Sequence, residues 1–323
     1  MPSKDRIKQK KHQLIPGAAL AVFLLFAVSV AKADSYDFYV DQGSAEVQEN
    51  GTEEYPFKTI GAAMSHIKSE KYKNKNVYIR KGTYSEQVEL ENNTDLIGED
   101  RNETTIDGSG RSYGIYFRST KSRVSNLTVE KAPTNIKVDK QSKAIINNCT
   151  ICEAGSNGVE VDKSKNSDKY KFTFRNSSIV DNGKRGMYIH KRKIEIAGCE
   201  ISGNVEEGID LHTGMRGTVR NNNIKSNGES GIEMMMAGTK ISIKGNSLSS
   251  NDTQGITIQV YSSQRGTMKL TGNSIRNNKN YGVRYARYDR NSIKIKYWQF
   301  IKKCVKLKKN TIQNNSDGDF SYI

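Results

Sequence analysis

The sequence predicts an all-β fold, a right-handed parallel β-helix solenoid with a short N-terminal capping helix. The main observation is a glycine followed by an apolar-x-apolar segment, which recurs at spacings of 21 to 28 residues, as expected for one coil of a solenoid. The segments begin at Gly114, Asn135 (in place of glycine), Gly158, Gly186, Gly208, Gly231, Gly255 and Gly282.

The alternate positions of these segments are always apolar or aromatic, in a chain that is only 35% hydrophobic. Successive side chains of a strand point to opposite faces, so these positions should form one buried face of stacked strands. The inward residues are Ile115/Phe117, Ile136/Val138, Val159/Val161, Met187/Ile189, Ile209/Leu211, Ile232/Met234, Ile256/Ile258 and Val283/Tyr285.

A second column supports the same stacking. Before each new coil comes a triplet that ends in an aliphatic residue, and its first member should occupy one turn in coil after coil. In the later coils this member is Asn222, Asn246, Asn273 and Asn310. Amides stacked at the ~4.8 Å strand spacing can hydrogen-bond along the axis, so we predict an asparagine ladder.

The cysteines fit this register as small buried residues. Cys149 and Cys199 share the ladder column two coils apart, roughly 9 to 10 Å, which exceeds the ~7 Å reach of a disulfide. Cys149 and Cys152 have the spacing of half a zinc site, but no second Cys or His pair follows. We therefore predict neither a disulfide nor a zinc site.

Residues 1–33 have the pattern of an export signal: five basic residues, an apolar run from Leu14 to Ala31, and the small-x-small sequence at 31–33. The chain is therefore expected to be secreted or at the cell surface. The alternative is an uncleaved anchor, in which residues 13–31 would make the only membrane contact.

Removing residues 1–33 takes away six of the 51 Lys+Arg and one of the 35 Asp+Glu, so the remainder carries +11. A charged polymer partner should be an anion.

The expected organisation after the signal is an N-terminal cap with the first coil (34–95) and the remaining coils with a basic end (96–323). Residues 56–68 place Ile60, Met64 and Ile67 on one face of a short helix after a proline, which can cover the first core layer. Residues 284–309 interleave basic and aromatic residues. This stretch is typical either of nucleic-acid or sugar binding or of a capping hairpin. We expect no nucleic-acid partner and a monomer.

The segment VYIRKGTYSEQVEL, the turn Leu96-Ile97-Gly98-Glu99 and the sequence TTIDG resemble the opening of pectin-lyase-like β-helix proteins. The preceding YVDQGS and GTEEYPFKTIGAA resemble the leader of their bacterial members. The resemblance covers nearly the whole chain after the signal. It implies the architecture and specifies no activity.

The outward positions of the same strands assemble a candidate site. His190 and His212 should lie in adjacent coils, beside Tyr188 and Asp210. Abstraction of the C5 proton of a uronate needs a base, an acid, and a cation or donors that neutralise the carboxylate. Either histidine suits the base, and Tyr188 suits the acid.

Lys191 and Arg192, which follow the strand, are the expected carboxylate neutralisers. Glu160, Glu233, Gln259 and Arg284 are expected to line the substrate surface. We predict no certain cofactor and no assigned metal ligand. A calcium ion held by Asp210, Glu233 and Glu160 is the one alternative. A polar sheet kept soluble by its charges explains the same residues without a site.

The sequence Glu-Gly-Ile-Asp-Leu-His at 207–212 resembles the Tyr-Gly-Phe-Asp-Pro-His strand of mannuronan C5-epimerases. The resemblance implies active-site roles for Asp210 and His212, with Glu233 one coil later where the family places another acid. Glu207 and Leu211 replace the family's tyrosine and proline. The family's own acid is therefore absent from this strand unless Tyr188 substitutes for it.

Together these features predict a carbohydrate-active protein that binds an acidic, uronate-containing polysaccharide and either cleaves it by β-elimination or epimerises it. A non-catalytic surface or adhesion protein with the same groove is the alternative. A glycoside hydrolase comes third, with Asp210 and Glu233, or Glu160 and Asp162, as the two carboxylates.

Overall fold

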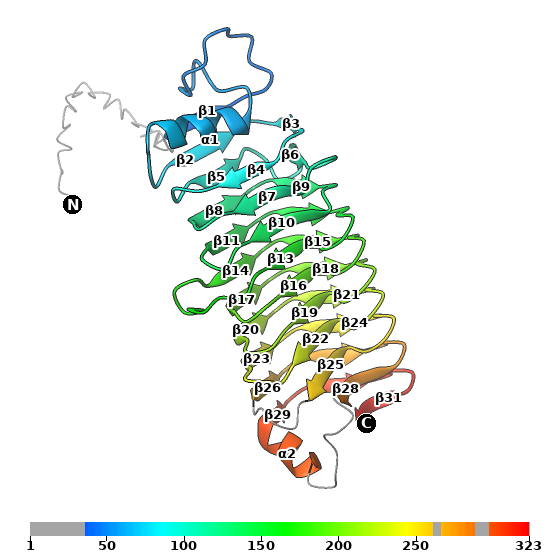
Figure 1. The fold of residues 1–323 in the computed structure, drawn as a ribbon. Helices are drawn as coiled ribbons and strands as arrows, with labels where there is room; N and C mark the ends of the chain where they lie inside the picture. Colours follow the sequence, from blue (N-terminus) through cyan, green and yellow to red (C-terminus); the bar gives the residue numbers. More distant parts are fainter. Residues whose placement is uncertain (1–35, 261–265, 288–296, 323) are drawn as a thin grey trace, which may run out of the picture. The chain divides into compact units, whose positions relative to one another are not determined.

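The computed structural model describes residues 36–260, 266–287 and 297–322. Three parallel β-sheets run along the stack of coils, and most coils contribute one strand to each sheet (Figure 1). Every paired strand is parallel, as a β-helix requires. The predicted fold class, a parallel β-helix with a short capping helix, is confirmed.

We call the three sheets A, B and C. Sheet A holds, in spatial order, β1 (Phe38–Val40), β2 (Asn76–Ile79), β5 (Asp95–Gly98), β8 (Lys121–Ser125), β11 (Lys143–Asn147), β14 (Phe172–Arg175), β17 (Lys193–Ala197), β20 (Arg216–Arg220), β23 (Lys240–Lys244), β26 (Thr267–Thr271) and β29 (Val305–Lys308). Sheet B holds β3 (Gly82–Tyr84), β6 (Thr104–Asp107), β9 (Thr128–Glu130), β12 (Thr150–Cys152), β15 (Ser178–Val180), β18 (Glu200–Ser202), β21 (Asn223–Lys225), β24 (Ser247–Ser249), β27 (Ser274–Arg276) and β30 (Thr311–Gln313). Sheet C holds β4 (Val88–Leu90), β7 (Tyr113–Phe117), β10 (Thr134–Val138), β13 (Val159–Val161), β16 (Met187–Ile189), β19 (Ile209–Leu211), β22 (Ile232–Met235), β25 (Ile256–Val260), β28 (Tyr281–Arg287) and β31 (Gly318–Tyr322).

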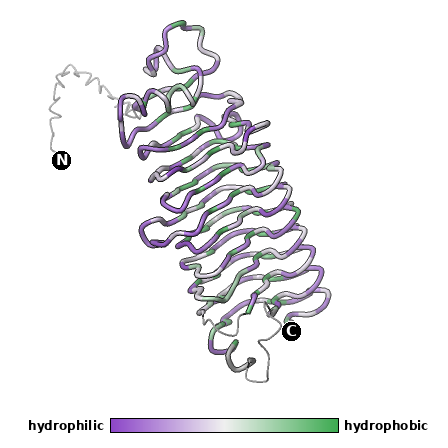
Figure 2. The backbone as a smooth tube through the Cα atoms, viewed as in Figure 1, coloured by the Kyte–Doolittle hydropathy of each residue, from purple (hydrophilic) through white to green (hydrophobic). Residues whose placement is uncertain are grey.

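The core fills the inside of the coils. All sixteen predicted inward residues are buried, with Tyr285 the most accessible of them at 3%. Hydrophobic stretches recur in each coil, whereas the turns between sheets are mostly hydrophilic (Figure 2). Because the inward side chains of one coil rest on those of the next, the glycine-marked segments all become strands of sheet C.

The predicted asparagine ladder is present. Nδ2 of Asn222 donates to Oδ1 of Asn246 at 2.9 Å, Asn246 donates to Asn273 at 3.0 Å, and Asn273 donates to Asn310 at 2.8 Å. Asn222, Asn246 and Asn273 are buried and Asn310 is half-buried, so most of these bonds satisfy amides that water does not reach.

A second asparagine ladder was not predicted from the sequence. It consists of Asn182, Asn204, Asn227, Asn251, Asn278 and Asn315, each donating to the next over 2.8 to 3.0 Å. Most of its members stand four residues before the glycine that opens a sheet C segment, as Asn182 does before Gly186. That constant offset is the signal that would have revealed it.

All four cysteines are free thiols. Cys149 and Cys199 are buried in the turn column that the asparagine ladder continues. Burial raises the pKa of both thiols to about 11, so they remain protonated and unreactive.

Helix α1 (Ile60–Ser69) covers the first coils at the N-terminal end of the stack (Figure 1). Thr59 caps it by accepting from the backbone N–H of Ala62, and Glu86 accepts from the first backbone N–H groups of the helix. Ile60 and Ile67 are buried, as predicted, and Met64 is half-buried against the same core.

At the other end, helix α2 (Tyr297–Cys304) leads directly into β29. Part of the basic stretch 284–309 lies outside the described residues. No helix within the described ranges combines the length and apolar character needed to cross a bilayer. The predicted signal or anchor, residues 1–33, also lies outside them.

Candidate active site

The outward face of sheet C brings the predicted site residues into neighbouring coils. Tyr188 on β16 is paired in register with Glu160 on β13 and with Asp210 on β19, and Asp210 is paired with Glu233 on β22. His190 and His212 directly follow β16 and β19. One outer wall therefore carries all of these groups, as the repeat predicts.

Tyr188, His190 and His212 form a contacting trio. The Tyr188 ring lies edge-on to both imidazoles, with centroids 4.5 Å from His190 and 4.8 Å from His212. The two imidazole centroids are 4.3 Å apart. Each of the three side chains is half-buried, so the trio is packed on one side and accessible on the other.

Both histidines are held in the neutral form. Burial, the neighbouring His190 and the charge of Arg185 lower the pKa of His212 to about 4. Burial also lowers the pKa of His190. Each imidazole therefore has a free lone pair at neutral pH and can accept a proton. The pKa of Tyr188 is raised, mainly by burial and by Asp210, so its hydroxyl keeps its proton.

Arg185 is a site residue that the sequence reasoning missed. Its Nε lies 3.0 Å from Oε2 of Glu207 and 3.0 Å from Oδ2 of Asp210, and its Nη1 lies 3.0 Å from Oε2 of Glu206. Arg185 and Glu207 each stand directly before the glycine of their coil. That shared position is the signal that would have placed them side by side.

Two carboxyl groups that contact Arg185, those of Glu207 and Asp210, have raised pKa values. Burial, together with a hydrogen bond to Glu229 and repulsion from Asp210, raises the pKa of Glu207 to about 8. Burial raises the pKa of Asp210 to about 7, against the opposing effect of Arg185. Oδ1 of Asp210 is buried and has no hydrogen-bond partner among the described residues. At neutral pH this cluster therefore holds protons and offers a carboxylic acid as a hydrogen-bond donor.

Two further acids on this wall are neutralised by Lys137, a neighbour on β10. Its Nζ lies 2.6 Å from Oε1 of Glu160 and 2.7 Å from Oδ1 of Asp162. Both predicted carboxylates are thus salt-bridged to one half-buried ammonium, which does not favour them as a pair of hydrolytic acids.

The structure does not bring together the calcium ligands considered from the sequence. Tyr188 separates Glu160 from Asp210 in the register, and each of these two carboxylates faces its own cation. Calcium prefers a cage of six to eight oxygen ligands, which these residues do not form.

Arg192 is not on the outer face, so its predicted place among the substrate-binding residues is wrong. It is fully buried, and its guanidinium donates to the carbonyl oxygens of Asp139, Ser142, Asp162 and Tyr170. These carbonyls belong to neighbouring coils. Arg192 therefore ties the turns beside the site together, which residue type alone did not reveal.

Lys191 does reach the surface. It lines a hollow of about 650 Å³ beside the histidines, together with Lys140, Lys163, Lys165 and Tyr170. The charge of Lys163 contributes to lowering the pKa of His190, which places the hollow next to the trio. This cationic hollow can receive an anionic group.

The remaining predicted residues lie on the other side of Asp210. Glu233 is half-buried and has a raised pKa because of that burial, opposed by a hydrogen bond with Gln259. Arg284 is two coils further along, paired in register with Thr257, and its charge also acts on Glu233. These three residues extend the wall and do not join the trio.

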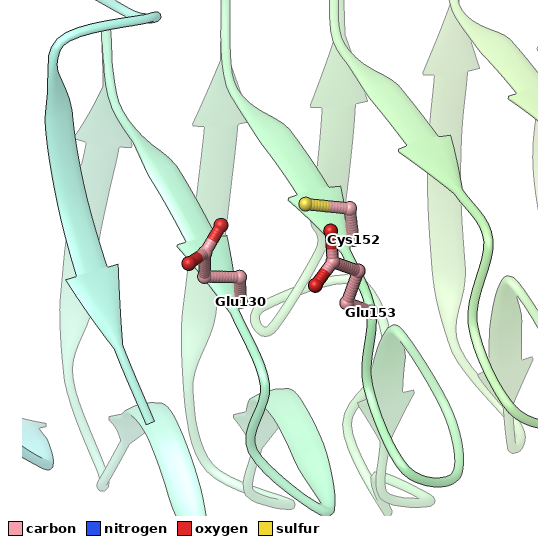
Figure 3. A group of neighbouring side chains, drawn as sticks. All are labelled: Glu130, Cys152 and Glu153. Carbon is pink, nitrogen blue, oxygen red and sulfur yellow. The ribbon is translucent and has the colours of Figure 1, made fainter. Parts of the chain in front are cut away.

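One group of potential metal ligands among the described residues lies on and beside sheet B. Glu130, Cys152 and Glu153 approach one another from neighbouring coils (Figure 3). The Cys152 thiol has its pKa raised to about 11 by burial and by the two acids, and Glu130 is paired with Lys131 at 2.5 Å. Calcium takes six to eight oxygen ligands, whereas this group offers two carboxylates and a thiol, so these residues do not fit a calcium site.

The family model described as right handed beta helix region matches residues 31–217 and 134–322. A comparison with curated proteins found no match. Several solved structures are similar to this chain in fold. The A-module of the mannuronan C-5 epimerase AlgE4 from Azotobacter vinelandii is 15% identical, with 88% of this chain and 98% of that chain covered and a TM-score of 0.54.

An alginate lyase from Paenibacillus sp. str. FPU-7 is also 15% identical, with 77% of this chain and 96% of that chain covered and a TM-score of 0.55. The periplasmic alginate epimerase AlgG, in a variant form, is 14% identical, with 77% of this chain and 74% of that chain covered and a TM-score of 0.50. At these identities the likeness shows a shared fold.

Proposed function

This chain belongs to the right-handed β-helix region family, and on that premise we propose that it acts on an acidic, uronate-containing polysaccharide at the outer wall of sheet C. The reaction begins with removal of the C5 proton of a uronate. The observation that carries the proposal is the contact of Tyr188 with two neutral imidazoles, directly beside the proton-holding carboxyl of Asp210.

His212 is the proposed base. Its neutral imidazole takes the C5 proton, and the electron pair of the broken C–H bond spreads onto the uronate carboxylate. Arg185 and the protonated Asp210 stabilise the charge that develops on this carboxylate. A carboxylic acid that keeps its proton near neutral pH serves here as a donor, which an ordinary aspartate would not.

Tyr188 is the proposed acid. In β-elimination the C4–O4 bond breaks as the C4–C5 double bond forms, and Tyr188 protonates the leaving oxygen. In epimerisation Tyr188 instead returns a proton to the opposite face of C5. Both outcomes use the same two groups, because they differ only in the fate of the carbanion.

The similar folds support this substrate class. The structures described above are named as epimerases of mannuronan or alginate and as an alginate lyase. The Asp-x-His spacing of Asp210 and His212 also matches the epimerase strand that the sequence resembles.

The test is incubation of the purified chain with alginate and with polygalacturonate. A lyase produces unsaturated ends that raise ultraviolet absorbance, and an epimerase changes the uronate composition without that signal. Tyr188→Phe and His212→Gln should each abolish turnover. Tyr116→Phe, in the same outward column, is the matched control and should retain it. Turnover that survives His212→Gln contradicts the assignment, and binding without either signal favours the adhesion alternative.

We also propose that residues 1–33 direct export and that the mature chain works outside the cytoplasm. The support is the basic stretch, the apolar run and the small-x-small sequence. The mass of the protein recovered from the medium and from membranes of an expressing cell tests it. A chain recovered from the cytoplasm with its first 33 residues intact contradicts the proposal.

A further inference from the structure

Sheet A presents a strongly basic outer face that the proposed reaction does not use. From β8 to β29, every strand of this sheet carries at least one outward cation. These residues are Lys121, Arg123, Lys143, Arg175, Lys193, Arg216, Arg220, Lys240, Lys244, Lys269, Lys306 and Lys308, with Lys171 directly before β14.

Many of these cations are direct cross-strand neighbours. Lys121 pairs in register with Lys143, Arg216 pairs with both Lys193 and Lys240, and in the same strands Arg220 pairs with Lys244. Parallel strands lie about 4.8 Å apart, and like charges directly opposite each other destabilise a sheet. Such repulsion repeated along one face indicates a partner that compensates it.

The protein itself supplies little compensation. Glu195 is the one carboxylate among the described outward residues from β8 to β29, and it is already paired with three cations. Lys171 lies 2.6 Å from it, Arg175 2.5 Å and Arg220 3.2 Å, and these cations lower its pKa to about 2. The loop residue Asp168 contacts Lys193 at 3.1 Å and Arg216 at 3.8 Å. The other cations of this face form no ion pair within the described ranges.

The other two sheets do not share this character. The outward residues of sheet B are largely Ser, Thr and Asn, and those of sheet C include Glu160, Asp162, Asp210 and Glu233. Cationic residues that served only solubility could be spread over all three sheets, whereas here they are concentrated on sheet A.

We propose that the outer face of sheet A, from β8 to β29, is a second, non-catalytic binding surface for a linear polyanion, specifically an acidic polysaccharide. A chain that runs along the stack meets a cation in nearly every coil. A shallow hollow of about 440 Å³ lies on this face, lined by Arg123, Lys143, Lys171 and Arg175. Neutral polar groups such as Asn147 and Thr173 line the same hollow and suit sugar hydroxyls.

The surface chemistry favours a polysaccharide over a nucleic acid. Single-stranded nucleic acids are held by aromatic side chains that stack on bases, and no aromatic side chain faces outward on β8 to β29 within the described residues. Sequence-specific recognition of duplex DNA needs a helix or a two-stranded ribbon that enters a groove, and this face is one side of a stretch of eight hydrogen-bonded strands. This inference is independent of the proposed function, because binding here requires no turnover.

The test compares two triple variants with the same change in net charge. Arg216→Gln with Lys240→Gln and Lys244→Gln removes cations from sheet A. Lys225→Gln with Arg276→Gln and Lys279→Gln, on and beside sheet B, is the matched control. Affinities for size-defined alginate and polygalacturonate fragments are measured at increasing salt. All chains carry His212→Gln, so that no substrate is consumed.

We expect the sheet A variant to bind about tenfold more weakly or worse, with a shallower salt dependence, and the control to bind like its parent. The melting temperature of the sheet A variant should equal or exceed that of the parent, since like-charge repulsion is relieved, which shows that it is folded. With His212 restored, the sheet A variant should keep its turnover number. An equal loss of affinity in the two triple variants overturns the proposal, because net charge alone would explain it. Equal affinity for duplex DNA and for the polysaccharide overturns the partner class.

Discussion

The guanidinium of Arg185 lies over the ring of Tyr188, with its central carbon 5.0 Å from the ring centroid. The same guanidinium contacts Asp210 and Glu207. Arg185 therefore links the proposed acid to the carboxyl groups that hold protons, and it opposes the rise of their pKa values. A residue with both roles should affect turnover and ionisation together.

Arg185→Gln should lower turnover about 10²-fold or more, since it removes a charge from the developing negative site. It should also raise the pKa of Asp210 further above its value of about 7. Steady-state kinetics and carboxyl titration by NMR check the two effects. Lys184→Gln, an exposed neighbour, is the control. A variant with reduced turnover but an unmoved Asp210 pKa would contradict the electrostatic role.

Asp210→Asn should flatten the dependence of stability on pH. The pKa of Asp210 is about 7 in the folded chain against a model value of 3.8, so the folded state binds more protons between these values. Its contribution to stability is complete below the unfolded pKa and is lost as pH rises through about 7. Denaturant unfolding from pH 4 to pH 8 should show a smaller loss of stability in the variant. If the dependence of unfolding free energy on pH is unchanged in the variant, another group, for example Glu207, binds the extra proton of the folded state.

The lowered pKa of His212 makes stability depend on pH in the opposite direction to that of Asp210. Its folded value of about 4 lies below the unfolded value of 6.5, so its contribution to stability is present above the unfolded pKa and is lost as pH falls through about 4. As the proposed base it should remain competent well below pH 6.5. The pH dependence of kcat/KM should therefore show no loss of a base near pH 6.5. A decline centred there would indicate a histidine of ordinary pKa.

Arg192→Met should destabilise the chain by about 2 to 5 kcal/mol, because it leaves buried carbonyls of neighbouring coils without their donor. Chemical denaturation measures the free energy of unfolding. Lys191→Gln, an exposed neighbour, should change it by less than about 0.5 kcal/mol. A mild effect of Arg192→Met would mean that the turns beside the site hold together without this side chain.

Asn251→Ala should cost about 1 to 3 kcal/mol, because Asn251 both accepts from Asn227 and donates to Asn278 in the second ladder. Asn223→Ala, at an exposed position in sheet B, is the control and should be nearly neutral. Melting temperature and denaturation midpoint report both. Equal effects of the two substitutions would show that the ladder adds nothing to the stack.

The coil, its inward residues and the neighbours along each column can all be predicted from the repeat. Strand side chains alternate with a period of two, so the glycine-marked segments specify which residues of sheet C face the core and which face outward. The stacked amides of Asn222 and Asn246 and the adjacency of Tyr188, His190 and His212 follow from the same period.

The positions of side chains outside the strands, and the groups that they contact, could be read from the folded chain alone. Turn residues have no alternation to follow, so Arg192 turned inward to buried carbonyls and Arg185 turned to Asp210 and Tyr188. The proton affinities of Asp210 and His212 likewise depend on burial and on charges from several coils. These are sums over neighbours in space, and a one-dimensional repeat does not contain them.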